Sequence, residues 1–395
     1  MKILQINNVY GEKSTGKITK AIHLGLLEIG HQSVVVFGRG EGTSDPGVIR
    51  LCPDFYGKWN NLFSRFSGMM YGGCFLSTLR LFYIIRKEKP DVVHLQCING
   101  YFVNIYRLIG WLKKHRIKTV VTLHAEFMYT ANCGHAFSCD QWKKGCQKCP
   151  DKKKATKSLL FDHTGRSWRA MKRAFSGFES DCIICPVSPW TEARAREGEI
   201  LKNFRFQTVY NGVDLQTFYR KNDSALARQP EVLHVTAHFD PTVDHAKGGY
   251  HLISLAKMLP QVRFLVAGIA EKTEYLPENL TLLGEIRDQN RLSSLYQSAW
   301  ASVLVSEKET FSMPCAESLC CGTPVVGFLA GGPEQIALKE YSDFVPFGQT
   351  EKLATLLASY LDKDRFDRNK IAEDAAKTYG VPAMLEQYLA IYRRV

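Results

Sequence analysis

The chain has 395 residues, of which 45% are hydrophobic, 11% aromatic and 23% charged. This composition excludes a mainly disordered chain, and the length exceeds that of one ordinary core, so we expect two domains. The formal net charge is +12, and no run approaches the roughly 18 uncharged apolar residues of a membrane-spanning helix. Met1 and Lys2 lead directly into residues 3–6 without the long apolar segment of a signal peptide, which predicts a cytoplasmic location.

Short β-rich runs alternate with longer amphipathic runs along the chain. The first series of predicted strands covers residues 3–9, 34–37, 92–95, 119–124, 182–187 and 207–210. The second series covers residues 232–237, 263–267, 280–283, 301–305 and 324–328. Helical periodicity fills most intervals, for example at 19–27, 101–114, 249–259, 291–299 and 351–361.

Strands that alternate with helices of this length favour parallel sheets. Two series therefore predict two doubly wound, Rossmann-like α/β domains, joined by the polar linker 221–230. Ligands of such sheets bind beyond the carboxyl ends of the strands, so a cleft between the domains is the expected place for chemistry.

A glycine-containing loop follows the first predicted strand. Residues 11–19 read GEKSTGKIT, which nearly matches the phosphate loop of ATPases. Ile18 stands where that loop needs a hydroxyl for magnesium, which argues against an ATPase. Two interpretations remain: the loop around Gly16 presents helix amides to an anion, or it is a plain strand-to-helix turn.

Two histidines stand near the carboxyl ends of consecutive predicted strands, His94 in 92–95 and His124 in 119–124. A neutral imidazole there can hydrogen-bond a polar ligand, although a single such histidine is more often structural. As a pair at equivalent places they favour a site. We give His124 more weight because the polar Glu126 follows it into the loop.

Twelve cysteines in a cytoplasmic chain are expected to be mostly reduced. Four of them fall within 17 residues and end in a C-x-x-C bounded by Gly and Pro: Cys133, Cys139, Cys146 and Cys149. This grouping suits a closed, tetrahedral structural zinc site, and four thiolates leave no position for a catalytic role of the metal. A redox-active or disulfide-bonded pair and unliganded thiols are the alternatives.

The segment between Lys143 and Arg173 is strongly basic. It holds eleven Lys or Arg and two Asp, so it carries +9 of the net +12. Such a segment attracts phosphate, whether in nucleic acid, in an anionic lipid or in a phosphorylated substrate, and a solvated face is the alternative.

The most specific pattern lies in the second half of the chain. A helix is expected to begin near Met313 and Pro314, with proline in the first turn, where its missing N–H costs little. The first amides of this helix favour an anion such as a diphosphate. Glu309 precedes the helix and Glu317 lies about one turn into it, so both carboxylates can accept hydrogen bonds from vicinal hydroxyls of a sugar or ribose. A capping acid and a solvated acid are the alternative.

Two further segments extend this pattern. Residues 322–327 (GTPVVG) and 330–335 (AGGPEQ) repeat the order of strand, glycine loop and helix, which predicts a second phosphate-binding geometry. Upstream, Lys247 opens a helix after the predicted strand 232–237, where its ammonium can neutralise a leaving diphosphate.

Taken together, these motifs resemble the retaining nucleotide-sugar glycosyltransferases of family 4, which have the two-domain GT-B fold. The resemblance covers nearly the whole chain. It rests on the E-x7-E pair Glu309 and Glu317 and on the runs 186–190, 210–214, 247–248, 320–326 and 331–334. The insert 133–149 looks like that of a subgroup found in polysaccharide-synthesis enzymes.

The resemblance implies a donor domain at 221–380. In it, Lys247 would bind the donor diphosphate, Glu309 the transferred sugar and Glu317 the ribose hydroxyls. The other donor contacts that the resemblance implies are Ile286 beside the nucleobase and the amides of Phe311, Ser312 and Met313 at the phosphates or sugar.

The resemblance also implies an acceptor domain at 1–220, which contains the insert 133–149. His124 would lie near the donor sugar, and the loop with Gly16 would approach the phosphates or the acceptor. A C-terminal helix at 381–395 would cross back onto this domain.

One position departs from the family pattern. The family usually has an Arg five residues before the lysine, as a second cation on the diphosphate, and this chain has Thr242 there in a lengthened segment. Arg287, His238 or His245 could compensate for the missing charge.

The resemblance implies transfer of a sugar, with retention, from a nucleoside diphosphate sugar to a saccharide acceptor. The acceptor is expected to be a polyprenyl-linked glycan of capsule, exopolysaccharide or lipopolysaccharide, and no catalytic metal is required. The basic segment 143–173 would hold the protein at the anionic inner face of the membrane. No nucleic-acid partner is expected. The competing interpretations are a zinc-containing nucleic-acid-binding protein and a catalytically inactive, glycosyltransferase-like binding module.

Overall fold

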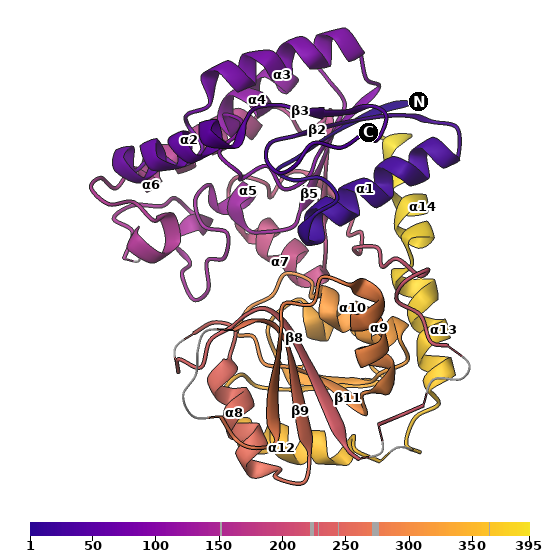
Figure 1. The fold of residues 1–395 in the computed structure, drawn as a ribbon. Coiled ribbons are helices and arrows are strands. Elements are labelled where there is room, and N and C mark those ends of the chain that lie inside the picture. Colours follow the sequence, from indigo (N-terminus) through magenta and orange to yellow (C-terminus); the bar gives the residue numbers. More distant parts are fainter. Residues whose placement is uncertain (151, 222–224, 228, 244, 271–275, 363) are drawn as a thin grey trace. The chain divides into compact units, whose positions relative to one another are not determined.

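The computed structural model describes residues 1–150, 152–221, 225–227, 229–243, 245–270, 276–362 and 364–395, without the side chains of Lys154 and Ala155. These residues form two compact units. The first comprises Met1–Tyr210 and Leu385–Val395, and the second comprises Asn211–Met384 (Figure 1). The predicted linker 221–230 lies partly outside the described residues.

The first unit is built on a seven-stranded sheet in the order β3-β2-β1-β4-β5-β6-β7, in which every pair is parallel. Its strands are β1 (Lys2–Asn7), β2 (Gln32–Phe37), β3 (Val48–Arg50), β4 (Val92–Leu95), β5 (Thr119–Leu123), β6 (Cys182–Pro186) and β7 (Arg205–Phe206). The inner strands are buried on both faces, which explains why their sequences are continuous apolar runs. The strand predicted at 207–210 is displaced, because β7 ends at Phe206 and the following residues only continue the hydrogen bonding along β6.

Helices cover both faces of this sheet (Figure 1). One face carries α1 (Lys13–Glu28) and the end of α14 (Val381–Tyr392). The opposite face carries α3 (Phe75–Glu88), α4 (Ile105–Lys114) and α6 (Thr164–Phe175), whose inward side chains complete the main core of the unit. Shorter or more peripheral elements are α2 (Asp54–Ser67), α5 (Phe127–Thr130), α7 (Pro189–Glu197) and single helical turns at Gln141–Lys143 and Lys152–Thr156.

The second unit has a six-stranded parallel sheet in the order β10-β9-β8-β11-β12-β13. Its strands are β8 (Glu231–Phe239), β9 (Arg263–Ala270), β10 (Leu280–Gly284), β11 (Ala301–Leu304), β12 (Val325–Phe328) and β13 (Ser342–Val345). Its helices are α8 (Gly249–Met258) and α12 (Thr350–Ser359) on one face, α9 (Gln289–Ser298), α10 (Met313–Cys320) and α13 (Arg368–Tyr379) on the other, and the short α11 (Pro333–Ile336).

The predicted fold class, two doubly wound α/β domains with parallel sheets, is confirmed. In each sheet the strand order reverses once, between β1 and β4 in the first unit and between β8 and β11 in the second. Ligands of such sheets bind outside the carboxyl ends of the strands at this reversal. Among the described residues, no helix combines the length and hydrophobicity that crossing a bilayer requires.

Candidate functional site

Lys247 and Glu309 meet at the reversal point of the second sheet. Lys247 follows β8 and Glu309 follows β11, and these strands are neighbours in the sheet. The Lys247 Nζ donates to Glu309 Oε1 at 2.6 Å, and the two side chains keep 33% and 26% of their surface exposed. The pair is therefore half-buried but open to a ligand, at the place where the fold binds one.

Gly248 allows the Lys247 loop to pack closely against the loop after β11. Gly248 has a φ of 70°, and a Cβ there would lie 1.9 Å from the carbonyl oxygen of Val305. The amide of Glu307 also donates to the carbonyl of Ala246 at 2.8 Å. Because no side chain fits at Gly248, the two loops pack backbone against backbone. This packing fixes the backbone position of Lys247, from which its side chain extends.

The Glu309 loop is joined to the glycine loop after β12. The amide of Glu309 donates to the carbonyl oxygen of Ala330 at 3.0 Å. The amide of Gly332 donates to the carbonyl oxygen of Glu309 at 2.8 Å. The Glu334 carboxylate accepts from the amides of Ala330 and Gly331 at 2.8–3.0 Å. The prediction of a second phosphate-binding geometry at 330–335 was wrong, because these amides bind protein oxygens and the loop braces Glu309 instead.

The helix expected near Met313 and Pro314 is present as α10, with proline in its first turn. Ser312 caps it, since its Oγ accepts from the amide of Cys315 at 3.4 Å, and its φ of 80° is rare for a residue other than glycine. Phe311 and Ser312 are buried. The first-turn amides of such a helix have no acceptor within the helix and favour an anion.

Glu317 lies one turn into α10 and is half-buried. The hydroxyl of Tyr296 in α9 lies 3.4 Å from its Oε2. Burial, followed by the Glu317 carboxylate, raises the pKa of Tyr296 well above its usual value, so the phenol stays a donor to Glu317. Ile286 is partly buried in the loop after the edge strand β10.

Two of the three side chains that could replace the missing Arg, Arg287 and His245, have acidic neighbours. Arg287 pairs with Glu285 at 2.9 Å, and His245 Nε2 lies 3.9 Å from an Asp240 oxygen. Thr242 is exposed, and Asp244 in the same segment lies outside the described residues.

Sequence patterns do not reveal His234, which is buried in β8 near the Lys247–Glu309 pair. Its Nδ1 lies 2.9 Å from the carbonyl oxygen of Val303, while its Nε2 has no hydrogen-bond partner among the described residues. Burial lowers the pKa of His234 to about 4, and the charges of Lys247 and Glu309 act on it in opposite directions. His234 stands within an apolar run that forms a strand, so the sequence does not indicate that it lies near Lys247 and Glu309.

In the first unit, His94 and His124 do not occupy equivalent places. His94 pairs in register with Val120, so His124 lies four residues beyond the position that pairs with His94. His94 is fully buried, and its ring nitrogens lie 2.7 Å from the hydroxyls of Tyr392 and Thr122. It therefore fastens the end of α14 to the sheet.

His124 lies just past the end of β5, where its Nε2 is 2.8 Å from Gln96 Oε1. Burial lowers its pKa to about 4, so the imidazole is neutral at physiological pH. Gly16 lies in the first turn of α1 and is buried. A Cβ there would stand 3.1 Å from Val9 and 3.3 Å from the Gly11 amide, so this glycine allows the helix to pack against the loop. The proposed ligand roles of His124 and Gly16 stay predictions.

The structure does not support the predicted zinc site in the four-cysteine insert. The described residues contain no group of three or more His, Cys, Asp or Glu side chains placed to hold a metal ion. Cys133 and Cys146 are buried, and burial raises the pKa of the Cys146 thiol to about 12, which favours the neutral thiol.

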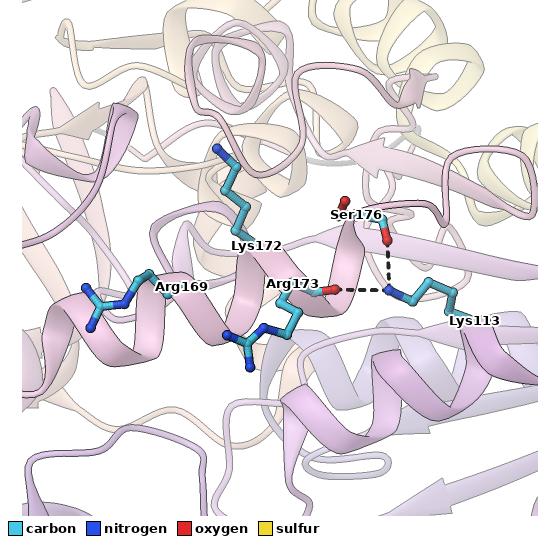
Figure 2. A pocket seen from close by; sticks show the side chains of 5 residues that line it. All are labelled: Lys113, Arg169, Lys172, Arg173 and Ser176. Atoms are coloured by element: carbon cyan, nitrogen blue, oxygen red, sulfur yellow. Dashed lines mark hydrogen bonds between the residues drawn. The ribbon is translucent and has the colours of Figure 1, made fainter.

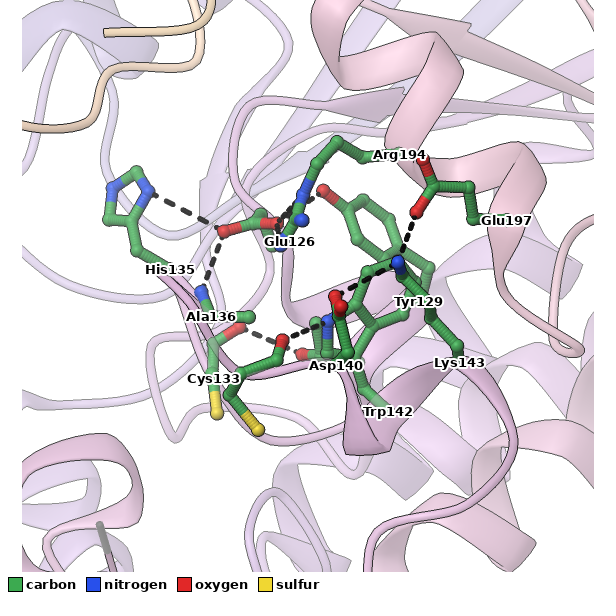
Figure 3. Close-up of polar contacts among 12 residues, drawn as sticks. Glu126, Tyr129, Cys133, His135, Ala136, Asp140, Trp142, Lys143, Arg194 and Glu197 are labelled. Carbon is green, nitrogen blue, oxygen red and sulfur yellow. Dashed lines mark hydrogen bonds and ion pairs between the residues drawn. The ribbon is translucent and has the colours of Figure 1, made fainter.

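A buried ion pair organises the insert instead (Figure 3). The Glu126 side chain is 1% exposed, and its Oε1 lies 2.9 Å from both Nε and Nη2 of Arg194 in α7. The same carboxylate accepts from the Tyr129 hydroxyl at 2.8 Å and from the Ala136 amide at 2.6 Å. The Arg194 guanidinium also lies over the Trp142 ring at 4.9 Å. Glu126 is therefore a structural residue and gives no support to His124 as a ligand.

The basic segment is partly neutralised by its own unit. Lys143 pairs with Asp140 and Glu197, and Lys172 pairs with Glu199. Asp151 lies outside the described residues. Figure 2 shows the part on α6, where Arg169, Lys172 and Arg173 line an open hollow with Lys113 and Ser176. Lys113 donates to the carbonyls of Arg173 and Ser176 at 3.0 and 2.7 Å and closes the end of α6.

Comparisons with known proteins match both halves of the chain. Residues 17–217 match the family model of Glycosyltransferase Family 4, and residues 237–378 match that of Glycosyl transferases group 1. The chain is 22% identical to the colanic acid biosynthesis glycosyl transferase WcaC of Escherichia coli (strain K12), with all of both chains covered.

Solved glycosyltransferases share the fold. Sucrose-phosphate synthase from Thermosynechococcus elongatus has a TM-score of 0.70 and 17% identity, covering 100% of this chain and 98% of that one. Anabaena HepE, solved in complex with UDP, has a TM-score of 0.66 and 14% identity over all of both chains. With the two parallel-sheet units and the family match over the first of them, this chain belongs to the family 4 glycosyltransferases and has the GT-B fold.

Proposed function

We propose that the protein transfers a sugar, with retention of anomeric configuration, from a nucleoside diphosphate sugar to a saccharide acceptor. The observation that carries this proposal is the Lys247–Glu309 pair at the reversal point of the second sheet, followed by the start of α10. An ammonium and a helix start supply positive charge, and two carboxylates supply acceptors for sugar and ribose hydroxyls. HepE has been solved with UDP and with UDP-glucose, which supports a nucleotide-sugar donor here.

In the proposed reaction, the acceptor oxygen attacks the anomeric carbon on the face from which the diphosphate leaves. The bond between that carbon and the phosphate oxygen breaks, and its electron pair stays with the diphosphate. The acceptor hydroxyl proton passes to the departing phosphate. Lys247 and the first amides of α10 stabilise the charge that develops on the diphosphate, while Glu309 holds the sugar.

The proposed function is tested with a panel of nucleoside diphosphate sugars. Release of nucleoside diphosphate is measured with and without a short saccharide acceptor. Acceptor-stimulated release with one donor supports the proposal. Nucleotide binding without release would favour the inactive binding module, and the absence of both would contradict the proposal.

Glu317 is proposed to hold the ribose. Glu317→Ala is expected to weaken nucleoside diphosphate binding by roughly 1–3 kcal/mol, the scale of a lost hydrogen bond to a charged group. Isothermal titration calorimetry measures this loss. The matched control is Glu340→Ala, which removes an exposed carboxylate elsewhere in the same unit. Equal nucleotide affinity in wild-type protein and Glu317→Ala would remove Glu317 from the site.

We further propose that the acceptor is linked to a polyprenyl lipid and that the basic segment 143–173 brings the first unit to the anionic inner face of the membrane. WcaC is named for colanic acid biosynthesis, which supports a role in glycan synthesis. The exposed cations of this segment among the described residues are available to lipid headgroups: Lys144, Lys148, Lys153, Lys157, Arg166, Arg169 and Arg173.

Replacing Lys152, Lys153 and Lys157 with Gln is expected to reduce sedimentation with anionic vesicles at low salt. Each basic residue near such a surface contributes about 1 kcal/mol, and this attraction is screened over about 8–10 Å at physiological salt. The prediction concerns binding only, so transfer to a soluble acceptor should be retained.

The control for this charge change lies in the second unit. Lys257, Lys339 and Lys377 are exposed there, and changing all three to Gln removes the same net charge. If this control lowers sedimentation as much as the first variant does, total charge rather than the basic segment governs the attraction.

A further inference from the structure

Two helices of the first unit carry large apolar side chains on their outer faces. On α2 the exposed residues are Phe55, Trp59, Leu62, Phe63 and Phe66. On α3 they are Phe75, Leu76, Leu79 and Tyr83. The spacings of three and four place each set in one stripe along its helix. Trp59 and Leu76 are 69% and 73% exposed, so the middle of each stripe faces solvent, while Phe75 at the start of α3 lies 4.9 Å from the Arg107 guanidinium.

The orientation of α2 is the reverse of that expected for a surface helix. Its inward side carries the small and polar residues Gly57, Asn60 and Ser64, and Tyr56 is its one apolar side chain packed against the core among the described residues. The Asn60 Oδ1 accepts from the amide of Cys74 at 2.8 Å, and the Ser64 hydroxyl donates to the carbonyl of Met69 at 3.2 Å. Surface helices of soluble proteins normally bury their apolar stripe. The stripe of α2 therefore faces mostly away from the core of this unit.

A third apolar segment adjoins the end of α2. Leu159, Leu160 and Phe161 are each at least half exposed. The amide of Leu159 donates to the carbonyl of Arg65 at 2.8 Å, and His163 Nδ1 lies 2.7 Å from the carbonyl oxygen of Ser67. The start of α3 adjoins α2 through the Cys74–Asn60 hydrogen bond. We call these three segments together the aromatic face.

The charged residues around the aromatic face are mostly basic. Lys58 and Arg65 are exposed on α2, and Arg80 and Lys87 are exposed on α3. Lys153 and Lys157 precede the third segment and are also exposed. The two acidic residues of these helices are already paired, Asp54 with Arg50 at 2.9 Å and Glu88 with Lys2 at 2.7 Å.

We propose that the aromatic face inserts into the headgroup–acyl boundary of an anionic lipid bilayer. Aromatic and aliphatic side chains suit that boundary, while the long stems of the surrounding lysines and arginines let their charges reach anionic headgroups. A second copy of this chain is a poorer match, because two such faces in contact would bring their basic rims together. The inference deepens the proposed function, on which it rests for the membrane location of the acceptor.

The inference adds a contact that salt does not screen. An electrostatic attraction by segment 143–173 alone disappears as ionic strength rises, whereas insertion of apolar side chains persists. Full-length protein is therefore mixed with vesicles of phosphatidylglycerol and phosphatidylcholine (1:1), and with pure phosphatidylcholine vesicles, at low and high salt. Sedimentation and the fluorescence of Trp59 are recorded, with Trp59→Phe as the spectroscopic blank.

The test variant is Trp59→Ser with Phe63→Ser. Its matched control is Leu24→Ser with Ile29→Ser, which removes two exposed apolar side chains at α1 on the other face of the same sheet. The test variant is expected to lower the vesicle partition coefficient about tenfold or more and to abolish its salt-resistant part. The control is expected to bind vesicles as wild type does. Because all four side chains are exposed, thermal melting should show both variants folded.

A blue shift of the Trp59 emission on anionic vesicles, absent from Trp59→Phe, supports insertion. Binding without that shift, or equal binding by the test variant, overturns the inference. A concentration-dependent dimer in analytical ultracentrifugation that Trp59→Ser with Phe63→Ser dissociates also overturns it and assigns the face to a second copy. Transfer to a soluble acceptor is assayed in parallel. If wild-type protein shows no transfer, the proposed function is contradicted. If wild-type protein transfers the sugar but does not bind vesicles, only this inference is contradicted.

Discussion

Lys247→Ala is expected to lower turnover by roughly 100- to 1,000-fold, the loss seen when one preorganised donor to a developing negative charge is removed. The charge on the diphosphate grows as the sugar–phosphate bond breaks, so the ammonium contributes most in the transition state. Binding of the free nucleoside should change little, because the nucleoside lacks the diphosphate that Lys247 is proposed to contact. The measurement is steady-state nucleotide release, together with calorimetry for the nucleoside.

Two variants sharpen this test. Lys247→Arg keeps the charge but replaces a compact ammonium with a planar fork, so it should restore only part of the activity. Lys308→Ala removes a partly exposed lysine one residue from Glu309 and should retain near wild-type turnover. Wild-type turnover in Lys247→Ala would exclude this residue from the chemistry and leave its ion pair with Glu309 as a structural contact.

Glu126→Ala is expected to destabilise the first unit by about 3–5 kcal/mol, because it leaves the Arg194 charge without its buried partner. It also removes the acceptor for the Tyr129 hydroxyl and the Ala136 amide. Urea denaturation followed by tryptophan fluorescence measures this loss. The control, Glu199→Ala, removes a partly exposed carboxylate whose ion pairs with Lys172 and Lys202 lie at the surface of the same unit, so it should change stability little.

The double variant Glu126→Ala with Arg194→Ala separates the ion pair from simple loss of packing. Removing both charges leaves no unpaired ion, so the double variant should lose less stability than the sum of the two single variants. Strict additivity would show that the two side chains stabilise the insert independently and would contradict the account of Figure 3.

Features set by short stretches of sequence were predictable. Continuous apolar runs such as Val232–Leu233 and Val325–Val326 mark strands buried on both faces, and Pro314 marks the start of α10. Glu309, Glu317 and Lys247 could be proposed as site residues because each lies next to a predicted strand or to the predicted start of α10. The edge strands β3 and β13 were missed, because they have only three and four residues and are mostly only partly buried.

Features set by contacts between distant residues could not be predicted. Glu126 and Arg194 are 68 positions apart, so the sequence shows an acid beside His124 and four nearby cysteines rather than a buried ion pair. His94 and Tyr392 are separated by 298 positions, and strand register is invisible to single-strand patterns. The bond from Glu334 to its own loop was missed for a different reason, since Gly-Gly-Pro-Glu is equally compatible with free and with capped amides.

The aromatic face shows a further limit of pattern analysis. The helical spacing of apolar residues on α2 indicates a helix but does not say which way the stripe points. Only the inward contacts of Asn60 and Ser64 reveal that it points outward. From the spacing alone, Trp59 and Phe63 would be placed in the core, and the exposed aromatic face would not be predicted.

The anomeric configuration of the reaction product tests the central claim most directly. Wild-type protein is incubated with the donor selected from the panel and a short soluble acceptor, and the product is examined by mass spectrometry and nuclear magnetic resonance. The account predicts an acceptor longer by one sugar, with the same anomeric configuration as in the donor. An inverted linkage would contradict attack on the face of the leaving diphosphate, and hydrolysis of the donor without any transfer would contradict the proposed glycosyl transfer itself.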